Sequence, residues 1–496
     1  MPKVLKVNRV LQLAVITSLA GGCLLSACTM GPNYVKPEVQ APKAFKEEPL
    51  KEGQGWKVAA PQDTLPKGNW WELFGDAELN ALVTQVEVSN LNIRAVQARY
   101  AQAKALVQQA RADYYPTVTG GLSFNRNKPA SNNINATNYD PAINSTYRLN
   151  ADASWEPDIW GRVKRLVEAS NASLQASAAD IEAAKLSAQA ELTQDYFLLR
   201  IADARKRLLY DTVAAYERSL KLTQNQYAVG VVARADVVAA ETQLKSAKAQ
   251  AVDVGVQRAQ LEHAMAVLLG KAPADFSVPV APSVVVSPPA IPLGIPSELL
   301  ERRPDIAAAE RRAAAANAQI GVAEAAYYPA LTLSATLGFQ SRSFSQWLTY
   351  PSRFWTLGAA LAQTIFDGGL RKAHTAQAVA VYDEIAANYR QSVLTAFQEV
   401  EDNLAALRIL GEEAQLQADA VKSARESAQI ANNQYKAGVV TYINVINAEA
   451  IALNNERTAL NVQSSQLSAA VLLIKALGGG WDTTALNEIP SNEVKK

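Results

Sequence analysis

Most of this 496-residue chain has the hydrophobic pattern of long helices. Apolar residues recur at spacings of three and four, as at Leu192, Tyr196 and Leu199, and no proline interrupts residues 162–228. At ~1.5 Å per residue this stretch predicts a helix about 100 Å long, and residues 370–436 predict a second one. Because alanine dominates the apolar stripe, neighbouring helices can pack closely, as they do in a coiled coil.

Four shorter segments alternate with a period of two, which is typical of a strand with one apolar face. The expected strands cover about residues 117–127, 145–157, 330–341 and 353–366. Each has about ten residues, the length that crosses an outer membrane when tilted. Large apolar residues alternate with polar ones that we expect to face a water-filled lumen, namely Asn150, Asp152, Thr332, Ser334 and Thr336.

The two halves of the chain are copies of one another. Residues 91–116 align without a gap with residues 304–329, at an offset of 213. Residues 225–244 align with residues 433–452 at an offset of 208, so the slip falls among the expected strands, where a surface loop tolerates a length change. A period this long indicates a duplicated domain with pseudo-twofold architecture rather than a solenoid.

These patterns divide the chain into successive segments. We expect a signal peptide at 1–27, a lipidated segment and collar at 28–80, a first repeat at 81–270, a linker with seven prolines at 271–296, a second repeat at 297–478 and a tail at 479–496. Within the repeats, the long helices at 162–228 and 370–436 are followed by return helices at about 234–269 and 442–477.

The N-terminus has the organisation of a secretory signal. Lys3, Lys6 and Arg9 precede an apolar stretch and then small residues. The end of the stretch, LSAC, resembles a bacterial lipobox, which predicts cleavage before Cys28 and lipidation of that cysteine, whereas Cys23 fits the pattern less well. The alternative is an uncleaved membrane anchor, because the apolar run is about long enough to span a bilayer.

Composition excludes several classes of function. The formal net charge is +1 and no cluster combines basic with aromatic residues, so nothing indicates a nucleic-acid partner. His263 and His374 are separated from each other and from both cysteines, so we expect no metal site. The chain has no GxSxG, HExxH or P-loop motif, so we expect no catalytic residues and no cofactor; any energy that its function needs must come from a partner.

Four strands are too few to seal a pore. In hydrocarbon every backbone polar group must be paired, so strands span a membrane only as a closed barrel. Two copies of the chain would give eight strands and an interior filled by side chains, whereas three would give twelve and leave room for water. We therefore expect a homotrimer whose single barrel draws four strands from each chain.

Each expected strand pair begins and ends at a recognisable junction. Tyr-Tyr-Pro occurs twice, where a helical pattern gives way to an alternating one: Tyr114, Tyr115 and Pro116, then Tyr327, Tyr328 and Pro329. Proline ends the helical hydrogen-bond ladder, and tyrosines suit a membrane interface. We expect the return from strand to helix at Gly161 and at the pair Gly368 and Gly369.

The far ends of the long helices are expected to form turns, at Gly230, Val231 and Val232 and at Gly438, Val439 and Val440. Glycine after the last helical turn is typical of a left-handed cap, and Thr441 is the expected N-cap of the next helix. Three chains would bring six such tips together and narrow the tube. The residues just beyond the turns are gate candidates: Asp236, Glu241, Ile443, Asn444, Asn447 and Glu449.

Several motifs, in order along the chain, resemble those of one family: CTMGPNYVKP (28–37), PSELLERRPDIAAAE (296–310), IFDGGLR (365–371) and NQYKAGVVTYINVINAE (433–449). The chain resembles the lipoprotein branch of the TolC-like outer-membrane efflux factors. The resemblance implies a mainly α fold with transmembrane β: a trimeric channel-tunnel in which a twelve-stranded β-barrel joins a long α-helical barrel. It also implies tips that dock to a periplasmic adaptor and to an inner-membrane pump, expected to be of the RND type, which expels drugs or other small toxic compounds.

Two details of the resemblance concern single residues. Residue 29 is Thr and not Asp, which resembles lipoproteins that are sorted to the outer membrane. We therefore expect Cys28 to carry a lipid anchor that includes palmitate and to lie in the outer membrane. Members of this family often close the tip with a ring of acidic residues, but this chain has Asn447 where relatives carry Asp. Asp236 is the alternative source of that charge.

Two other interpretations stay open at this point. The same fold serves as the outer-membrane component of type I protein secretion, and the lipobox favours small-molecule efflux only through the family resemblance. A structural coiled-coil surface protein without a pore is the second alternative, although such a protein would not need two strand pairs in mid-sequence with polar residues on one face.

Overall fold

The structure of the protein is a computed structural model. It describes residues 29–42, 45–47, 69–128, 142–281, 288–289, 291 and 302–480. The expected signal peptide, the lipidation site Cys28 and the tail beyond residue 480 lie outside the described residues, as do parts of the expected collar and of the proline-rich linker.

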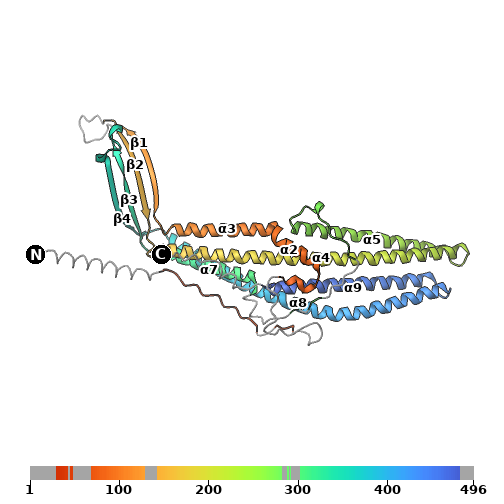
Figure 1. Cartoon of the computed structure of the whole chain (residues 1–496). Helices are drawn as coiled ribbons and strands as arrows, with labels where there is room; N and C mark the ends of the chain where they lie inside the picture. Colours follow the sequence, from red (N-terminus) through yellow and green to blue (C-terminus); the bar gives the residue numbers. More distant parts are fainter. Residues whose placement is uncertain are drawn as a thin grey trace. The chain divides into compact units, whose positions relative to one another are not determined.

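Helices make up most of the described chain (Figure 1). The first repeat contains α2 (Ala77–Ser89), α3 (Leu91–Ala112), α4 (Arg162–Ala228) and α5 (Arg234–Leu268), and the second contains α7 (Pro304–Ala325), α8 (Leu370–Lys436) and α9 (Tyr442–Ala476). Short 3₁₀ helices are η2 (Trp70–Phe74), η3 (Pro273–Asp275), η5 (Phe344–Gln346) and η6 (Tyr350–Ser352). Within the described part of the chain, no helix combines the length and the apolar composition needed to cross a membrane.

The helices repeat the internal duplication in their lengths. α3 and α7 have 22 residues each, α4 and α8 have 67 each, and α5 and α9 have 35 each. The first pair is related by the offset of 213 seen in the sequence and the other two pairs by the offset of 208. Each repeat therefore builds the same succession of a shorter helix, two strands, a long helix and a return helix.

The strands form one sheet in the order β1 (Thr117–Asn127), β2 (Asn144–Trp155), β3 (Ala330–Ser341) and β4 (Arg353–Ala362), antiparallel throughout (Figure 1). Each repeat supplies one hairpin, and the β2–β3 pairing joins them. β4 ends before the expected residue 366 because its last residue pairs with Ala330, where β3 begins, and no partner lies beyond.

The chain divides into two compact units. The first combines the described residues up to Pro37 with Ala101–Ala176 and Glu310–Asn388, and it contains the sheet. The second combines Glu38–Tyr100, Ser177–Ala309 and the described residues from Tyr389 onward, and it contains the helix tips.

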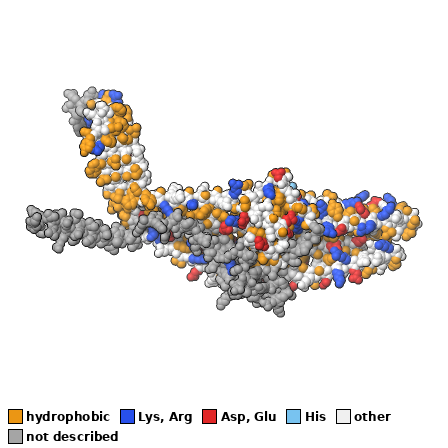
Figure 2. Space-filling view, viewed as in Figure 1, with side chains coloured by type: hydrophobic (Ala, Val, Ile, Leu, Met, Phe, Trp, Pro, Cys, Tyr) orange, Lys and Arg blue, Asp and Glu red, His pale blue; other side chains and the backbone are white. Residues whose placement is uncertain are grey.

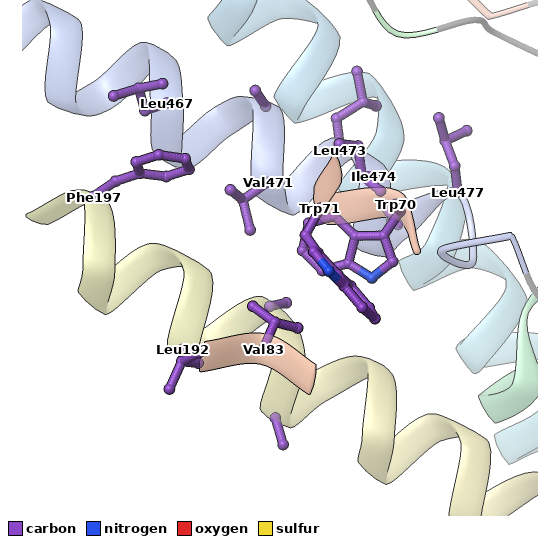
Figure 3. Packing of buried hydrophobic residues seen from close by; sticks show 14 of the residues in the cluster. Trp70, Trp71, Val83, Leu192, Phe197, Leu467, Val471, Leu473, Ile474 and Leu477 are labelled. Carbon is purple, nitrogen blue, oxygen red and sulfur yellow. The ribbon is translucent and has the colours of Figure 1, made fainter. Parts of the chain in front are cut away.

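The largest hydrophobic core lies in the second unit and is built around η2 (Figure 3). Trp70 is fully buried and Trp71 is almost so, and both lie among side chains of α4 and α9, including Phe197, Val471 and Ile474. A tryptophan side chain can bury ~150–250 Å², so this short segment outside the repeats packs against helices from both repeats.

An extended segment of residues 29–37 lies against α4 and α7 within the first unit. The buried Arg165 donates through Nε to the carbonyl of Met30 at 2.9 Å, and the hydroxyl of Tyr34 donates to Glu310 Oε1 at 2.6 Å. These bonds satisfy buried polar groups on both repeats. The segment after Cys28 is therefore fixed to the helices from Met30 onward.

Candidate functional site

The sheet has one apolar and one polar face. Residues opposite each other in the register share a face, and the register places Leu337 opposite both Ala151 and Trp355. Side chains on this apolar face are largely exposed: Val118, Leu122, Phe124, Leu337, Trp355, Leu357 and Leu361. Figure 2 shows hydrophobic side chains covering the sheet. An exposed apolar surface of this extent indicates contact with lipid or with protein.

The opposite face of the sheet carries the polar residues that were predicted from the sequence to face a lumen. Asp152 lies between Thr119 of β1 and Thr336 of β3 in the register. Its carboxylate accepts hydrogen bonds from the hydroxyl of Thr336, at 2.6 Å, and from the amide of Asn150. All five predicted residues, Asn150, Asp152, Thr332, Ser334 and Thr336, occupy this face.

The sheet ends in two strands that have no further neighbour within the described chain. β1 and β4 each pair on one side only. An unpaired strand edge exposes a row of backbone donors and acceptors, which soluble proteins avoid or protect. The two edges run antiparallel, since β1 and β4 are separated by two antiparallel neighbours, so β4 of one copy can pair with β1 of another in the geometry already used within the sheet.

The Tyr-Tyr-Pro junctions lie between a helix and a strand in both repeats. Tyr114 and Tyr115 form the closing turn after α3, where their amides donate to the carbonyls of Arg111 and Ala112 at 3.1 and 3.0 Å. Tyr327 and Tyr328 make the equivalent bonds after α7, and Pro116 and Pro329 precede the strands. The four tyrosines are exposed by 37 to 63%.

Two tryptophans hold these junctions to the strand ends. Trp155, the last residue of β2, donates through its indole to the carbonyl of Tyr114 at 3.0 Å. Trp160 donates to the carbonyl of Pro329 at 2.8 Å and stacks on Tyr328 with 4.9 Å between ring centroids. Each of the two junctions is therefore held by a tryptophan at or just after the end of β2.

The return from strand to helix uses the predicted glycines together with two carboxylates that sequence reasoning missed. Gly161, Gly368 and Gly369 have φ of 76°, 63° and 95°. Asp158 accepts bonds from the first amides of α4, and Asp367 accepts one from Gly369 at 2.9 Å. An Asp just before a helical pattern is the signal that would have identified them.

The two tip turns have the same hydrogen bonds. Gly230 N–H donates to the carbonyl of Tyr227 at 3.0 Å, and Val231 N–H donates to that of Gln226 at 2.9 Å. Gly438 and Val439 make the equivalent pair with Tyr435 and Gln434, both at 2.9 Å. This is the Schellman arrangement, which requires a left-handed residue; the φ values of the two glycines are 77° and 74°.

The predicted gate residues differ in how they are placed within one chain. Ile443, Asn444 and Asn447 are exposed on the first turns of α9, whereas Asp236 and Glu241 on α5 are half-buried. Thr441 stands at the N-cap position of α9 with an extended backbone, but its hydroxyl accepts no backbone N–H. The two tips contact each other, since Ala240 of α5 packs with Tyr435 and Tyr442 in one buried cluster.

Glu449 is half-buried between helices of its own chain. Gln243 on α5 lies beside its carboxylate and also beside Tyr216 of α4. Its Oε2 atom is buried and has no hydrogen-bond partner among the described residues. Desolvation by this burial raises the pKa of Glu449 to about 7.

Two tyrosines that sequence reasoning missed join the tips of the two repeats. Tyr435 and Tyr442 are buried, with ring centroids 5.2 Å apart. The hydroxyl of Tyr442 lies 3.1 Å from that of Ser219 on α4, and the hydroxyl of Tyr435 lies 3.2 Å from that of Thr223. Tyr435 belongs to the repeated NQY motif, so the repetition itself was the available signal.

The equivalent residue of the first repeat is in a different environment. Tyr227 lies 208 positions before Tyr435 and in the same motif, yet it is 43% exposed, whereas Tyr435 is 3% exposed. The first helices of the repeats differ in the same way: α7 buries most of its residues, and α3 buries only a narrow stripe that includes Ile93, Ala103 and Val107. The first repeat thus has surfaces that the second repeat covers.

Comparison with known protein families shows which family the chain belongs to. Residues 82–271 and 295–479 match the family described as "Outer membrane efflux protein", one block for each repeat. The chain belongs to the outer membrane efflux protein family. It is therefore an outer-membrane component of an efflux system, and its fold is that of the family's channels.

The sequences of curated relatives align with this efflux protein over almost its whole length. It is 32% identical over 480 residues to the outer membrane protein OprJ of Pseudomonas aeruginosa, and the match covers 94% of this chain and 96% of OprJ. It is 31% identical over 468 residues to the solvent efflux pump outer membrane protein SrpC of Pseudomonas putida, with 93% and 97% covered.

Solved structures show the same fold. The outer-membrane channel OprN superposes with a TM-score of 0.85 at 30% identity, over 92% of this chain and 100% of that one. The outer membrane channel CmeC of Campylobacter jejuni superposes with a TM-score of 0.84 at 25% identity, over 92% and 96%. Among the described residues of this efflux protein, no group of His, Cys, Asp or Glu is arranged to hold a metal ion.

Proposed function

We propose that three copies of this chain form one passive channel, in which each sheet contributes four strands to a twelve-stranded β-barrel in the outer membrane. The observation that carries the proposal is the sheet itself, which has an exposed apolar face, a polar face and two unpaired edges. In a bilayer such edges must be paired, and cyclic repetition of the chain pairs all of them. Twelve strands leave a lumen wide enough for water, whereas eight are filled by side chains.

The difference between the repeats supports cyclic assembly independently of the sheet. Tyr435 of the second repeat is covered by the first repeat of the same chain. In a closed ring of alternating repeats, Tyr227 meets the second repeat of the next chain and becomes covered in the same way. The exposed side of α3 finds an equivalent neighbour there, so the helices complete an α-helical barrel.

The helix tips are the proposed docking surface for a periplasmic adaptor. The turn valines Val231 and Val439 are exposed by 67% and 71%, and the neighbouring Val229 by 75%. Apolar side chains on a rigid, capped turn suit insertion into an apolar groove of a partner. Through the adaptor the channel is joined to an inner-membrane pump of the RND type, which supplies the energy.

The proposed gate lies at the same tips. Asp236, Glu241, Ile443, Asn444 and Asn447 occupy the first turns of α5 and α9 and are at least partly exposed in the single chain. When six tips converge, these side chains narrow the opening. Because Asn444 and Asn447 are neutral, Asp236 and Glu241 are the proposed source of negative charge there.

The proposed cargo consists of drugs or other small toxic compounds. Relatives are named for the efflux of solvents, toluene and antibiotics. Lipidation of Cys28, with palmitate among its acyl chains, anchors each chain in the outer membrane. The segment that follows Cys28 is held to the helices by Arg165 and Tyr34.

Deleting the gene and reconstituting the purified protein test this proposal together. The deletion strain is expected to become more susceptible to dyes, antibiotics and solvents, and the protein is expected to conduct ions in planar bilayers. Unchanged susceptibility together with loss of a secreted protein would instead identify the alternative, type I protein secretion. An absence of conductance would indicate a structural coiled-coil protein.

A further inference from the structure

The polar face of the sheet carries two charges, and they are opposite in sign. In the described sheet, the side chains that β1, β3 and β4 place on this face are all uncharged. Both charged residues of the face, Arg148 and Asp152, belong to β2. No described residue forms a salt bridge with either of them. The other charged residues of the described strands, Arg126 and Arg353, lie on the apolar face near the loop end of the sheet.

Two hydrogen bonds hold the side chain of Asp152 in a fixed position. Thr336 Oγ1 donates to its Oδ1 at 2.6 Å, and Asn150 Nδ2 donates to its Oδ2. Both donors are neutral, so the hydrogen bonds orient the carboxylate without cancelling its charge. The residue is half-buried by its neighbours and directed across β3.

Arg148 is held differently and is likewise not neutralised. Its guanidinium carbon lies 5.0 Å from the centroid of the Phe354 ring, across the sheet on β4. Its Nε is buried and has no hydrogen-bond partner among the described residues. A ring face stabilises the cation by its quadrupole but leaves the net charge in place.

We propose that Asp152 and Arg148 form two rings of opposite charge that set the ionic selectivity of the barrel. The inference rests on the proposed trimer, in which each residue occurs three times around the lumen. The four-residue separation along β2 is about 13 Å of strand, which spaces the rings by about 10 Å along the axis of a barrel with strands tilted by ~40°. Asp152 lies nearer the helical end of the sheet and Arg148 nearer the loop end, so outgoing solutes pass the negative ring first.

The arrangement has a consequence for the type of solute that passes. The negative ring concentrates cations and repels anions, and the positive ring does the opposite. Neutral or zwitterionic compounds meet the smallest barrier at the two rings together. The charges act through a water-filled lumen, so their effect weakens as added salt shortens the screening length from ~30 Å at 0.01 M to ~10 Å at 0.1 M.

Reversal potentials of reconstituted channels in asymmetric KCl test the inference. Asp152→Asn is expected to lower the permeability ratio of K⁺ to Cl⁻ about two-fold or more at low salt, and Arg148→Gln is expected to raise it by a similar factor. Both changes shrink in molar salt. Asp152→Glu, which keeps the charge, and Ser334→Ala, which alters the same face without a charge, are expected to match the parent protein.

The outcomes distinguish this inference from the proposal beneath it. If the parent conducts and both charge variants keep its permeability ratio at low salt, the charge rings are wrong while the channel stands. The charge rings are equally wrong if Ser334→Ala shifts the ratio as much as Asp152→Asn does. If the parent protein does not conduct at all, the trimeric channel itself is contradicted. Arg148→Gln gives an independent result should Asp152→Asn fail to insert.

Discussion

At the scale of single residues, the tip glycines are constrained by their left-handed backbone. Gly438 has φ of 74° and closes the Schellman turn after α8. A side chain there strains the left-handed backbone by about 1–2 kcal/mol. The residue is equivalent to Gly230, and both stand at the surface proposed for adaptor docking.

We expect Gly438→Val to lower the free energy of unfolding by about 1–2 kcal/mol and to reduce cross-linking of the tips to the adaptor. Gly411→Ala is the matched control, since that glycine lies inside α8 and a Cβ there meets nothing within 4 Å. Denaturant unfolding and cysteine cross-linking measure the two effects. Unchanged stability and unchanged cross-linking in the Gly438 variant would refute the assignment.

Glu449 makes stability depend on pH. Its pKa is raised to about 7, from an ordinary value near 4.5, by desolvation among Gln243, Tyr216 and Tyr442. Between these two pH values the folded protein binds more protons at this site than the unfolded chain does. The free energy of unfolding therefore falls as pH rises from 4.5 to about 7, by at most about 3 kcal/mol.

The variant Glu449→Gln cannot ionise and is expected to lose this part of the pH dependence, becoming more stable than the parent at pH 8 and similar to it at pH 4.5. Thermal unfolding followed across that range provides the measurement. Glu241→Gln, the same substitution on the neighbouring return helix, is the control. Parallel curves for the parent and the Glu449 variant would show that the carboxylate is ionised at no cost in the folded state.

At the scale of secondary-structure elements, the sheet predicts opposite outcomes for adjacent residues. Leu357 lies on the apolar face near the middle of β4 and is 72% exposed, and Thr356 lies on the polar face opposite Thr336. Leu357→Arg places a charge against lipid, at a cost of about 2–4 kcal/mol near the bilayer midplane. Thr356→Arg places the same charge in the lumen.

We expect the Leu357 variant to insert poorly into the outer membrane and the Thr356 variant to insert normally with altered ion selectivity. Membrane fractionation with heat-modifiability on gels compares them directly. Equal insertion of both variants would contradict the assignment of the faces, and poor insertion of the Thr356 variant alone would invert it.

The elements also show what sequence reasoning can reach. The alternation that predicted four strands survives in the structure because a strand with one wet and one apolar face needs that period, and the polar set around Asp152 follows from it. The long helices are predictable because they lack proline and keep the spacing of three and four. Strand ends are less predictable, since β4 stops where its partner β3 begins.

Contacts between elements could not be predicted from the sequence. Nothing local distinguishes Tyr435, which is buried, from Tyr227, which is exposed, because the difference arises from which repeat lies next to each. The inward placement of Glu449 depends on Gln243 and Tyr216 from two other helices. Thr441 was expected to cap α9 with its hydroxyl, but the structure has no such bond.

At the scale of the whole molecule, the exposed Tyr227 predicts an interface. Tyr227→Glu places a charge in the contact proposed between neighbouring chains and is expected to weaken the trimer by ten-fold or more in the dissociation constant, the effect of about 1.4 kcal/mol. Tyr210→Glu, at a tyrosine of the same helix that is 53% exposed, is the control. Sedimentation in detergent measures trimer dissociation for both variants. Equal dissociation of the two variants would contradict the placement of Tyr227 in the interface.

The central claim is that one chain cannot seal the pore and that three chains do. Native mass spectrometry of the purified protein released from lipid nanodiscs tests it most directly, combined with conductance of the same sample. The account predicts a conducting species with three times the mass of the processed chain. A conducting monomer or dimer would contradict it.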